Sequence, residues 1–396
     1  MSENISTVRY NFRLRPGKKA IAKLEADWNC CRAVWNHCVS VGNESFLCAK
    51  ENVKHEGPTF CRMSKRLTDM RAEFDWLKEG SSVAQQQTIR NWSAAYQSAF
   101  KQKAKGWPKF KSGKVALPTL EYTTCGFSIK DGKIRLPGKI TIPVVWSREL
   151  PSDPKTVTVT RDCSGHWYAS FVVRRDNEEF PDSSGGVGID WGVSKVATTD
   201  QGENFDLKCG NQILNTSKDL KKAQRRLSKA KKGSRGRIKA RKAVARIHLK
   251  RTRQRKDRAF KWARKIVTNF SHIAIEDFKP KFLTKSTMAK KAADGAVGMT
   301  KQILENMAEQ AGRTVALVNP AYTTMTCANC GTRAKQRLEL TQRTFECACG
   351  YTAGRDLNAA RVILAKAGFD LASADTVRPK HTSVCLGRVE LGIPFL

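Results

Sequence analysis

The chain has 396 residues, which suggests two or three domains, and its 40% hydrophobic residues are enough for a sizeable core. Lys and Arg number 72 against 36 Asp and Glu, so the formal net charge is +36. Because so basic a chain favours an anionic partner, nucleic acid is the partner that we expect. We find no apolar run of transmembrane length, no signal peptide and no Walker-type loop, and the 13 cysteines are an odd number that argues against a disulfide framework.

The N-terminal part combines strands with a helical insertion. Residues 7–15 alternate between apolar and basic side chains, which predicts a strand with one cationic face. From residue 18 to about 105 the apolar period becomes helical and indicates three or four helices. Residues 106–180 return to short strands, expected at 126–130, 133–136, 139–145, 156–161 and 167–174. If the first strand pairs with these, the helices are an insertion in a small antiparallel barrel or sandwich.

The C-terminal part shows a mixed α/β pattern after a linker at 181–185. Strands are expected at 187–190, 195–199, 204–208, 272–276 and 314–319, and helical segments at 218–268, 301–312 and 356–368. Three strands followed by helix, strand, helix, strand and helix are the order of a ribonuclease-H-like sheet. Residues 371–396 show no clear period, and we interpret them as a tail without regular structure.

The helical segment at 218–268 is strongly basic. Residues 218–265 contain 23 Lys or Arg and two acids. A glycine-containing break at 232–236 predicts two helices, with an apolar seam formed by Leu220, Leu227, Ile238, Ala245 and Leu249. A solvated charge run is the alternative, but charges of one sign repel each other, so we expect this hairpin to bind a phosphate backbone.

Four cysteines have the spacing of a metal site. Cys327 and Cys330 form a C-x-x-C pair followed by Gly, and Cys347 and Cys349 form a shorter C-x-C pair, also followed by Gly. Two such turns across a short hairpin predict a Cys₄ zinc ribbon, structural because four protein ligands leave no open position. The alternative is a set of buried or redox-active thiols. The other nine cysteines lack metal-like spacing.

Three acids stand out because the chain has few of them. Asp190 ends an apolar strand, Glu276 ends another, and Asp356 opens the final helix. Singly, each is compatible with an ordinary strand end or helix cap. Together they follow the ribonuclease-H-like scheme, in which carboxylates gather at one sheet edge and two magnesium ions offset their repulsion during phosphodiester hydrolysis. Asp277 is the substitute if Glu276 is the wrong member.

These motifs together resemble the TnpB (OrfB) family of transposon-encoded RNA-guided DNA nucleases, relatives of compact CRISPR type V effectors. The specific parts of the resemblance are Gly188-Ile-Asp-Trp-Gly192, Ile275-Glu-Asp-Phe-Lys279, the cysteine pairs with their flanking residues, and Gly354-Arg-Asp-Leu-Asn-Ala-Ala360. Weaker parts are Trp28-Asn-Cys-Cys-Arg-Ala-Val-Trp-Asn36 and Gly106-Trp-Pro-Lys-Phe-Lys111. The likeness covers nearly the whole chain.

The resemblance implies a multidomain α/β architecture. A wedge β-barrel carries an inserted helical recognition domain, and a RuvC-type nuclease domain carries an inserted zinc ribbon. The expected segments are wedge 1–17, recognition domain 18–105, wedge 106–182, nuclease 183–326 with its basic hairpin at 218–268, zinc ribbon 327–349, nuclease 350–370 and tail 371–396.

The resemblance also implies an activity. We expect a magnesium-dependent endonuclease that uses a guide RNA to find double-stranded DNA beside a short flanking motif, and that cuts both strands in turn at one site. Asp190, Glu276 and Asp356 would bind two magnesium ions, while Cys327, Cys330, Cys347 and Cys349 would bind one zinc ion. The expected location is the prokaryotic cytoplasm, at the nucleoid, without a membrane partner.

Several alternatives remain compatible with the sequence. One is an RNA-independent transposase or resolvase, which ribonuclease treatment would leave active. Another is a compact CRISPR type V effector, distinguished by neighbouring DNA. A third is a guided DNA-binding repressor, which would bind without cutting. A general RNA-binding protein fits the charge but leaves the three acids unexplained.

Overall fold

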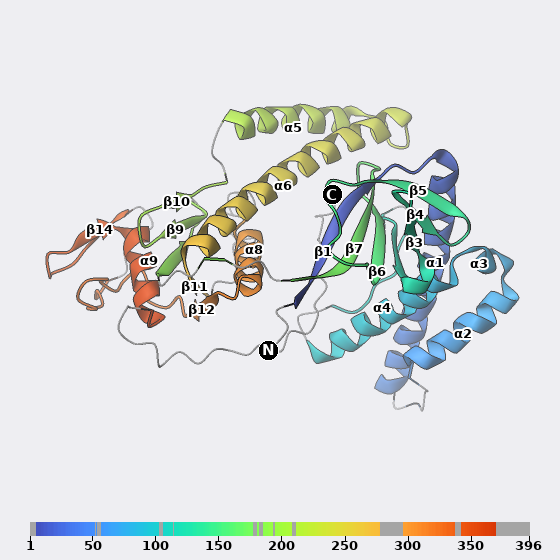
Figure 1. Ribbon diagram of the computed structural model, residues 1–396, viewed down its shortest axis with the longest axis horizontal. Helices are drawn as coiled ribbons and strands as arrows, with labels where there is room; N and C mark the ends of the chain where they lie inside the picture. The colour runs from blue at the N-terminus through green and yellow to red at the C-terminus, as the bar shows by residue number, and fades with distance from the viewer. Residues whose placement is uncertain are drawn as a thin grey trace. The chain divides into compact units, whose positions relative to one another are not determined.

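A computed structural model describes residues 5–51, 53, 57–102, 106–113, 115–176, 180–181, 185–192, 195–207, 211–277, 296–336 and 342–369, without the side chains of 211–217. The described residues fall into two compact units, one within 1–177 and 226–246, the other within 178–225 and 247–396. Figure 1 labels their helices and strands. The tail expected at 371–396 lies outside the described residues.

The first unit contains a seven-stranded antiparallel sheet of order β2-β6-β7-β1-β5-β4-β3 among the described residues. Its strands are β1 (Ile5–Leu14), β2 (Thr119–Thr123), β3 (Ser128–Lys130), β4 (Lys133–Leu136), β5 (Ile140–Val145), β6 (Thr156–Arg161) and β7 (Trp167–Asp176). The helices between β1 and β2 are α1 (Lys18–Lys50), α2 (Phe60–Glu73), α3 (Asp75–Glu79) and α4 (Ser82–Lys101). A short 3₁₀ helix, η1 (Thr124–Gly126), follows β2.

The pairing of the first strand with later strands is confirmed. Strand β1 pairs with β7 along its whole length, from Ile5 opposite Asp176 to Leu14 opposite Trp167. Strand β2 was not predicted, although Leu120 and Tyr122 point inward from it. Five residues are too few for the alternation alone to distinguish a strand from a loop.

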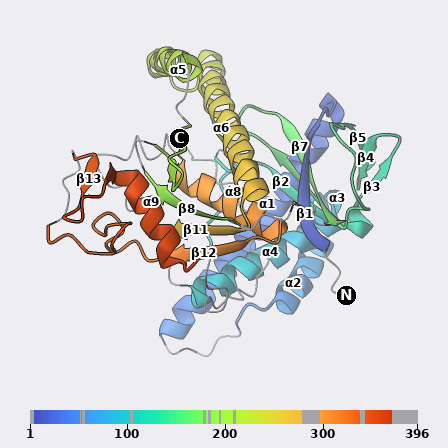
Figure 2. The ribbon, with the colours of Figure 1, turned by 60° about the vertical axis from the view of Figure 1, so that its left-hand side comes forward.

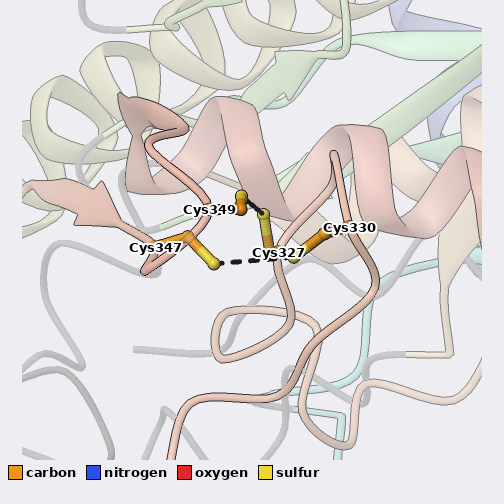
Figure 3. A group of neighbouring side chains, drawn as sticks. All are labelled: Cys327, Cys330, Cys347 and Cys349. Carbon is orange, nitrogen blue, oxygen red and sulfur yellow. Dashed lines mark hydrogen bonds between the residues drawn. The ribbon is translucent and has the colours of Figure 1, made fainter.

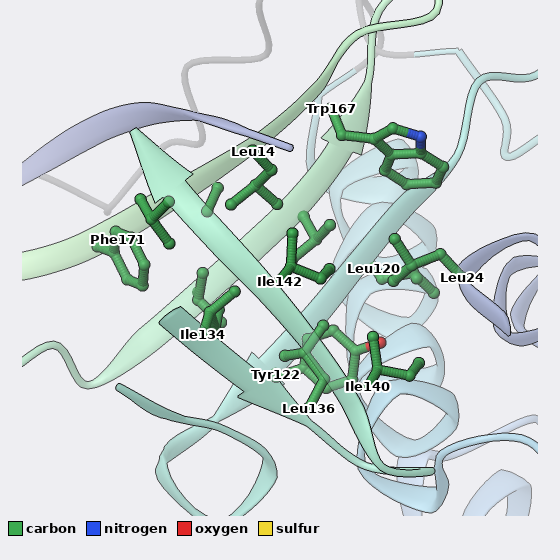
Figure 4. Close-up of a cluster of buried hydrophobic side chains, with 14 of the residues drawn as sticks. Leu14, Leu24, Leu120, Tyr122, Ile134, Leu136, Ile140, Ile142, Trp167 and Phe171 are labelled. Carbon is green, nitrogen blue, oxygen red and sulfur yellow. The ribbon is translucent and has the colours of Figure 1, made fainter. Parts of the chain in front are cut away.

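Alternate residues of these strands form one core (Figure 4). Strand β5 alternates buried and exposed residues along its whole length. Leu24 of α1 joins Phe171, Ile142 and Tyr122, and each of these four residues is at most 1% exposed. Burying a Leu, Ile or Phe side chain contributes about 1.5–3 kcal/mol. The first turns of α1 are thereby held against the sheet.

The second unit contains a five-stranded sheet of order β10-β9-β8-β11-β12 among the described residues. Its strands are β8 (Gly186–Trp191), β9 (Ala197–Thr199), β10 (Asn204–Phe205), β11 (His272–Glu276) and β12 (Thr314–Val318). Strands β8, β11 and β12 are parallel, while β9 and β10 are antiparallel to their neighbours. The helices after β7 are α5 (Asn211–Lys229), α6 (Arg235–Asn269), α8 (Val297–Gln310) and α9 (Arg355–Lys366), of which residues 226–246 belong to the first unit. The predicted order of strands and helices is confirmed.

The two faces of this sheet differ in side-chain size. Val187 and Ile189 of β8 point to the core shared with α6 and α8. Gly186 and Gly188 alternate with them and point to α9, which packs on the other face with Ile363 and Leu364 (Figure 2). Small residues on that face let the backbone of α9 approach the sheet closely.

The basic segment forms the two predicted helices, α5 and α6. Arg237 donates from its guanidinium to the carbonyls of Leu227 and Ala230, at 3.0 and 2.9 Å, and so closes the end of α5. The expected seam was wrong at Ile238, which is 53% exposed, whereas Val244 is buried. Neither α6 nor any other described helix is apolar enough over a sufficient length to cross a membrane.

A two-stranded sheet of β13 (Thr344–Glu346) and β14 (Thr352–Gly354) precedes the final helix. Strand β14 ends at Gly354 and α9 begins at the next residue. The start of α9 is therefore joined directly to this small sheet.

Replacing Gly188 with Ala tests the close approach of α9. An added Cβ would lie 2.1 Å from the Ala360 carbonyl oxygen and 2.9 Å from Leu364 backbone nitrogen, so the helix must shift. We expect Gly188→Ala to reduce the free energy of unfolding by about 1–3 kcal/mol, measured by urea denaturation.

Gly185→Ala is the matched control, because its added Cβ would lie 3.6 Å from Phe270, an ordinary contact. A Gly188→Ala protein that unfolds at the same urea concentration as the wild type would show that α9 does not pack this closely.

Candidate active site and metal centre

Two buried carboxylates end neighbouring parallel strands. Strand β11 pairs with β8 so that Ile275 lies opposite Ile189, and Glu276 and Asp190 follow these residues. Because side chains alternate along a strand, both acids point to the face that α9 covers. Asp190 is 9% exposed and Glu276 is 6% exposed.

Helix α9 adds the third acid at the same face. Gly354 precedes α9 and offers no side chain to cap it, and Asp356 lies in the first turn. The partial positive charge at a helix N-terminus favours a carboxylate there. The Asp356 side chain is 32% exposed, and its Oδ1 lies 3.5 Å from Nε of Arg355.

The three acids interact electrostatically. Burial raises the pKa of Asp190 well above its ordinary value, the charges of Glu276 and Asp356 raise it further, and Arg355 opposes them. Burial also raises the pKa of Glu276. Ionising such a cluster is costly unless cations offset the repulsion, and carboxylate oxygens are the ligands that Mg²⁺ prefers. The structure thus places Glu276 and Asp356 close enough to Asp190 for their charges to act on it.

Asp277 occupies a different environment from Glu276. Its side chain is 52% exposed and lies 4.0 Å from Nζ of Lys301. Its backbone nitrogen donates to the carbonyl of Val318, which extends the pairing of β11 with β12. Glu276, rather than Asp277, is therefore the buried acid at the end of β11.

Two buried residues that the sequence did not reveal contact Glu276. Thr323, 2% exposed, donates its hydroxyl to Oε1 of Glu276 at 2.7 Å. Lys301, 9% exposed, donates from Nζ to the Glu276 carbonyl at 2.8 Å. The hydroxyl of Thr323 and the charges of Lys301 and Lys366 lower the pKa of Glu276 and partly offset its burial.

Only one of these contacts left a signal in the sequence. Lys301 shares the helical stripe of Leu304 and Ala308, which are buried, so a lysine at that position is out of place. Thr323 lies in a turn with no periodicity and offered no such signal.

The four predicted cysteines converge on one point (Figure 3). Their Sγ atoms lie within 4.8 Å of one another. Sγ of Cys327 is 3.8 Å from that of Cys349, and Sγ of Cys330 is 3.6 Å from that of Cys347. A tetrahedron with Zn–S bonds of about 2.3 Å has edges of about 3.8 Å, so these sulfurs fit zinc.

Glycines close both cysteine turns. Gly331 and Gly350 have φ values of 72° and 83°, in the left-handed region that glycine adopts without strain. The backbone nitrogen of Gly331 donates to the carbonyl of Cys327, and that of Gly350 donates to the carbonyl of Cys347, each at 3.0 Å. Thr332 hydrogen-bonds Cys330 and lowers the pKa of its thiol, and the neighbouring thiols of Cys349 and Cys347 lower it further.

The remaining described cysteines are separate from this cluster. Cys31 and Cys38 lie in the interior of the first unit, where burial raises the pKa of each thiol to about 12. Such thiols remain protonated and unreactive at neutral pH.

Two family models match the second half of the chain. The model described as "Probable transposase" (OrfB_IS605) matches residues 170–287, and the model described as "Cas12f1-like, TNB domain" matches residues 298–363. The first match contains Asp190 and Glu276, and the second contains all four cysteines and Asp356.

A solved structure shares the fold. The chain in the cryo-EM structure of the Cas12f1-sgRNA-target DNA complex is similar with a TM-score of 0.60 at 13% identity. The alignment covers 91% of this chain and 99% of that one.

Two curated proteins are similar over almost their whole length. A protein from Streptomyces pristinaespiralis, provisionally named RNA-guided DNA endonuclease, is 31% identical over 96% of this chain and 94% of its own length. A protein from Escherichia coli (strain K12), provisionally named RNA-guided DNA endonuclease InsQ, is 29% identical over 93% of this chain and 94% of its own. With this identity and coverage, the chain belongs to the TnpB (OrfB) family.

Proposed function

We propose that the protein is an RNA-guided, magnesium-dependent DNA endonuclease encoded by a transposon, and that Asp190, Glu276 and Asp356 are its catalytic residues. The observation that carries this proposal is the convergence of two acids on a third, since the charges of Glu276 and Asp356 both raise the pKa of the buried Asp190. Perturbed carboxylates gathered at one sheet edge are typical of a catalytic site. The names of the relatives support the guided activity.

The acids would act by holding divalent metal. When bound, Mg²⁺ supplies an activated water and stabilises the leaving oxygen in phosphodiester hydrolysis. Asp190 and Glu276 would bind it from neighbouring strands, and Asp356 from the first turn of α9. Strands and helices hold ligands more rigidly than loops, so each carboxylate starts close to its binding geometry.

Charge supports a nucleic-acid partner. Residues 218–265, which form much of α5 and α6, contain 23 Lys or Arg and two acids. Basic side chains in this density bind a phosphate backbone and release counterions, so binding weakens with salt. Guide RNA and double-stranded target DNA are the partners that we propose, with base pairing supplying specificity and the protein binding a short flanking motif.

The domain boundaries are part of the same proposal. Residues 1–17 and 106–182 would form the wedge around a recognition domain at 18–105, and 183–326 with 350–370 would form the nuclease around a zinc ribbon at 327–349. The helices inserted after β1 and the position of the cysteines between β12 and α9 support this division.

Cleavage by the purified complex tests the catalytic assignment. We expect the protein, together with its co-purified RNA, to cut a plasmid that carries the matching target. Cleavage should slow by roughly 100-fold or more in each of the variants Asp190→Asn, Glu276→Gln and Asp356→Asn. RNA binding should remain intact, because these acids are not part of the basic helices.

Asp277→Asn is the matched control and should cut at nearly the wild-type rate. Ribonuclease treatment should abolish cleavage, and activity that survives it would favour an RNA-independent transposase. Binding without cleavage by the unmutated complex in magnesium would indicate a repressor.

The raised pKa values predict a pH dependence. Since the pKa of Asp190 and that of Glu276 are both raised, protons compete with Mg²⁺ for these carboxylates at higher pH than they do for ordinary ones. We expect cleavage at limiting Mg²⁺ to fall as the pH is lowered, and this acidic limb to move to lower pH as Mg²⁺ is increased. Cleavage rates across pH at limiting and saturating Mg²⁺ measure the shift. Identical pH profiles at the two concentrations would contradict the competition.

The cysteine cluster predicts one zinc ion per chain. We expect elemental analysis of the purified protein to find it, and Cys330→Ser to lose most of it and to melt at a lower temperature, because three thiolates bind zinc less tightly than four. Cys61→Ser is the control, since Cys61 is an exposed cysteine outside the cluster. Full zinc content in Cys330→Ser would show that the Cys330 thiol is not a zinc ligand.

A further inference from the structure

Residues 321–328 join strand β12 to the first cysteine pair, and they contact two of the proposed catalytic elements. We call these residues the linking segment. Toward the sheet, the Thr323 hydroxyl donates to Oε1 of Glu276 at 2.7 Å. Because Thr323 is 2% exposed, water cannot easily replace this donor. The bond fixes the rotation of the Glu276 carboxylate about its own stem.

Toward the final helix, the linking segment is held by Asn358. Its Oδ1 accepts from the Ala328 backbone nitrogen at 2.9 Å, and its Nδ2 donates to the Thr326 carbonyl at 2.8 Å. Asn358 is fully buried, and it uses both ends of its amide. An aspartate would lack the donor, and a leucine would lack both groups.

Each side of the linking segment is thus connected to a proposed metal ligand. Asn358 lies two positions after Asp356 in α9, and Ala328 lies between Cys327 and Cys330. At its other end, Nζ of Lys366 donates to the Ala321 carbonyl at 2.9 Å, so α9 contacts the linking segment at two points.

The backbone of the linking segment is strained next to Thr323. Tyr322 has φ of 66°, in the left-handed region that an aromatic residue rarely adopts. Both the backbone nitrogen and the hydroxyl of Thr326 donate to its carbonyl, at 3.0 and 2.9 Å, and the Arg333 guanidinium lies 3.2 Å from its ring centre. Strained residues persist where the surrounding contacts determine them, and they cluster at functional sites.

We propose that the linking segment positions the catalytic metal site, with Thr323 and Asn358 as positioning residues that hold Glu276 and the start of α9 in their relative geometry. The proposal rests on the proposed function. Helix α9 has no side-chain cap, and the buried Asn358 ties its first turn to the linking segment. The cysteine cluster then contributes to the active site indirectly, by holding Ala328 in place.

The role of Thr323 is tested by the magnesium dependence of cleavage. Thr323→Val keeps the volume and removes the hydroxyl, so we expect the half-saturating Mg²⁺ concentration to rise roughly 10-fold or more. Thr323→Ser keeps a hydroxyl and should restore most of this affinity. Thr324→Val, at the neighbouring half-buried threonine, should leave half-saturation unchanged.

Asn358 is tested in the same RNA-loaded complex. Asn358→Leu should also raise half-saturating Mg²⁺ roughly 10-fold, while RNA binding and zinc content remain at wild-type levels. Variants that only unfold part of the protein would lower the amount of active complex and leave half-saturation unchanged. That result, or wild-type magnesium dependence in both Thr323→Val and Asn358→Leu, overturns the positioning role.

The outcomes separate this proposal from the proposed function. If Glu276→Gln cuts as fast as the wild type, the carboxylate assignment itself fails. If Glu276→Gln is inactive and Thr323→Val keeps wild-type half-saturation, the nuclease assignment stands and the positioning role is rejected.

Discussion

Helix α9 lies on strand β8 because residue 188 has no side chain. The Ala360 carbonyl occupies the place that a Cβ would need, and the small Ala274 on the neighbouring strand is buried in one cluster with Ile363 of α9. This close approach brings the first turn of α9 to the ends of β8 and β11. The spacing of Asp356 from Asp190 and Glu276 therefore depends on a packing contact one turn further along the helix, and the proposed site depends on the absence of a side chain at residue 188.

The site that this packing creates lowers the stability of the metal-free fold. A carboxyl whose pKa is raised in the folded state binds protons more tightly there than in the unfolded chain. Folding stability from Asp190 therefore declines as the pH rises through that raised pKa. A divalent cation bound there, as we propose, would reverse this loss of stability, because it would stabilise the ionised acids. The proposed function of Asp190 therefore lowers folding stability in the absence of metal.

Much of this site follows from the sequence, and the reason is periodicity. Strand and helix patterns placed Asp190 and Glu276 at the ends of two strands and Asp356 at the start of the final helix, and the cysteine spacing needed no structure at all. The roles of Thr323 and Asn358 could not be predicted from the sequence, because their hydrogen-bond partners lie in turns or far along the chain. Ile238 shows the opposite error, since a plausible apolar stripe includes a side chain that the fold leaves exposed.

The order of the segments along the chain has a consequence for synthesis. Strand β8 and the basic helices leave the ribosome well before α9, which closes the site from the other end of the unit. A nascent chain therefore completes its proposed nucleic-acid-binding surface before its proposed catalytic site. On the proposed assignment, a chain whose translation stops before Asp356 would carry the basic helices without the third acid of the site.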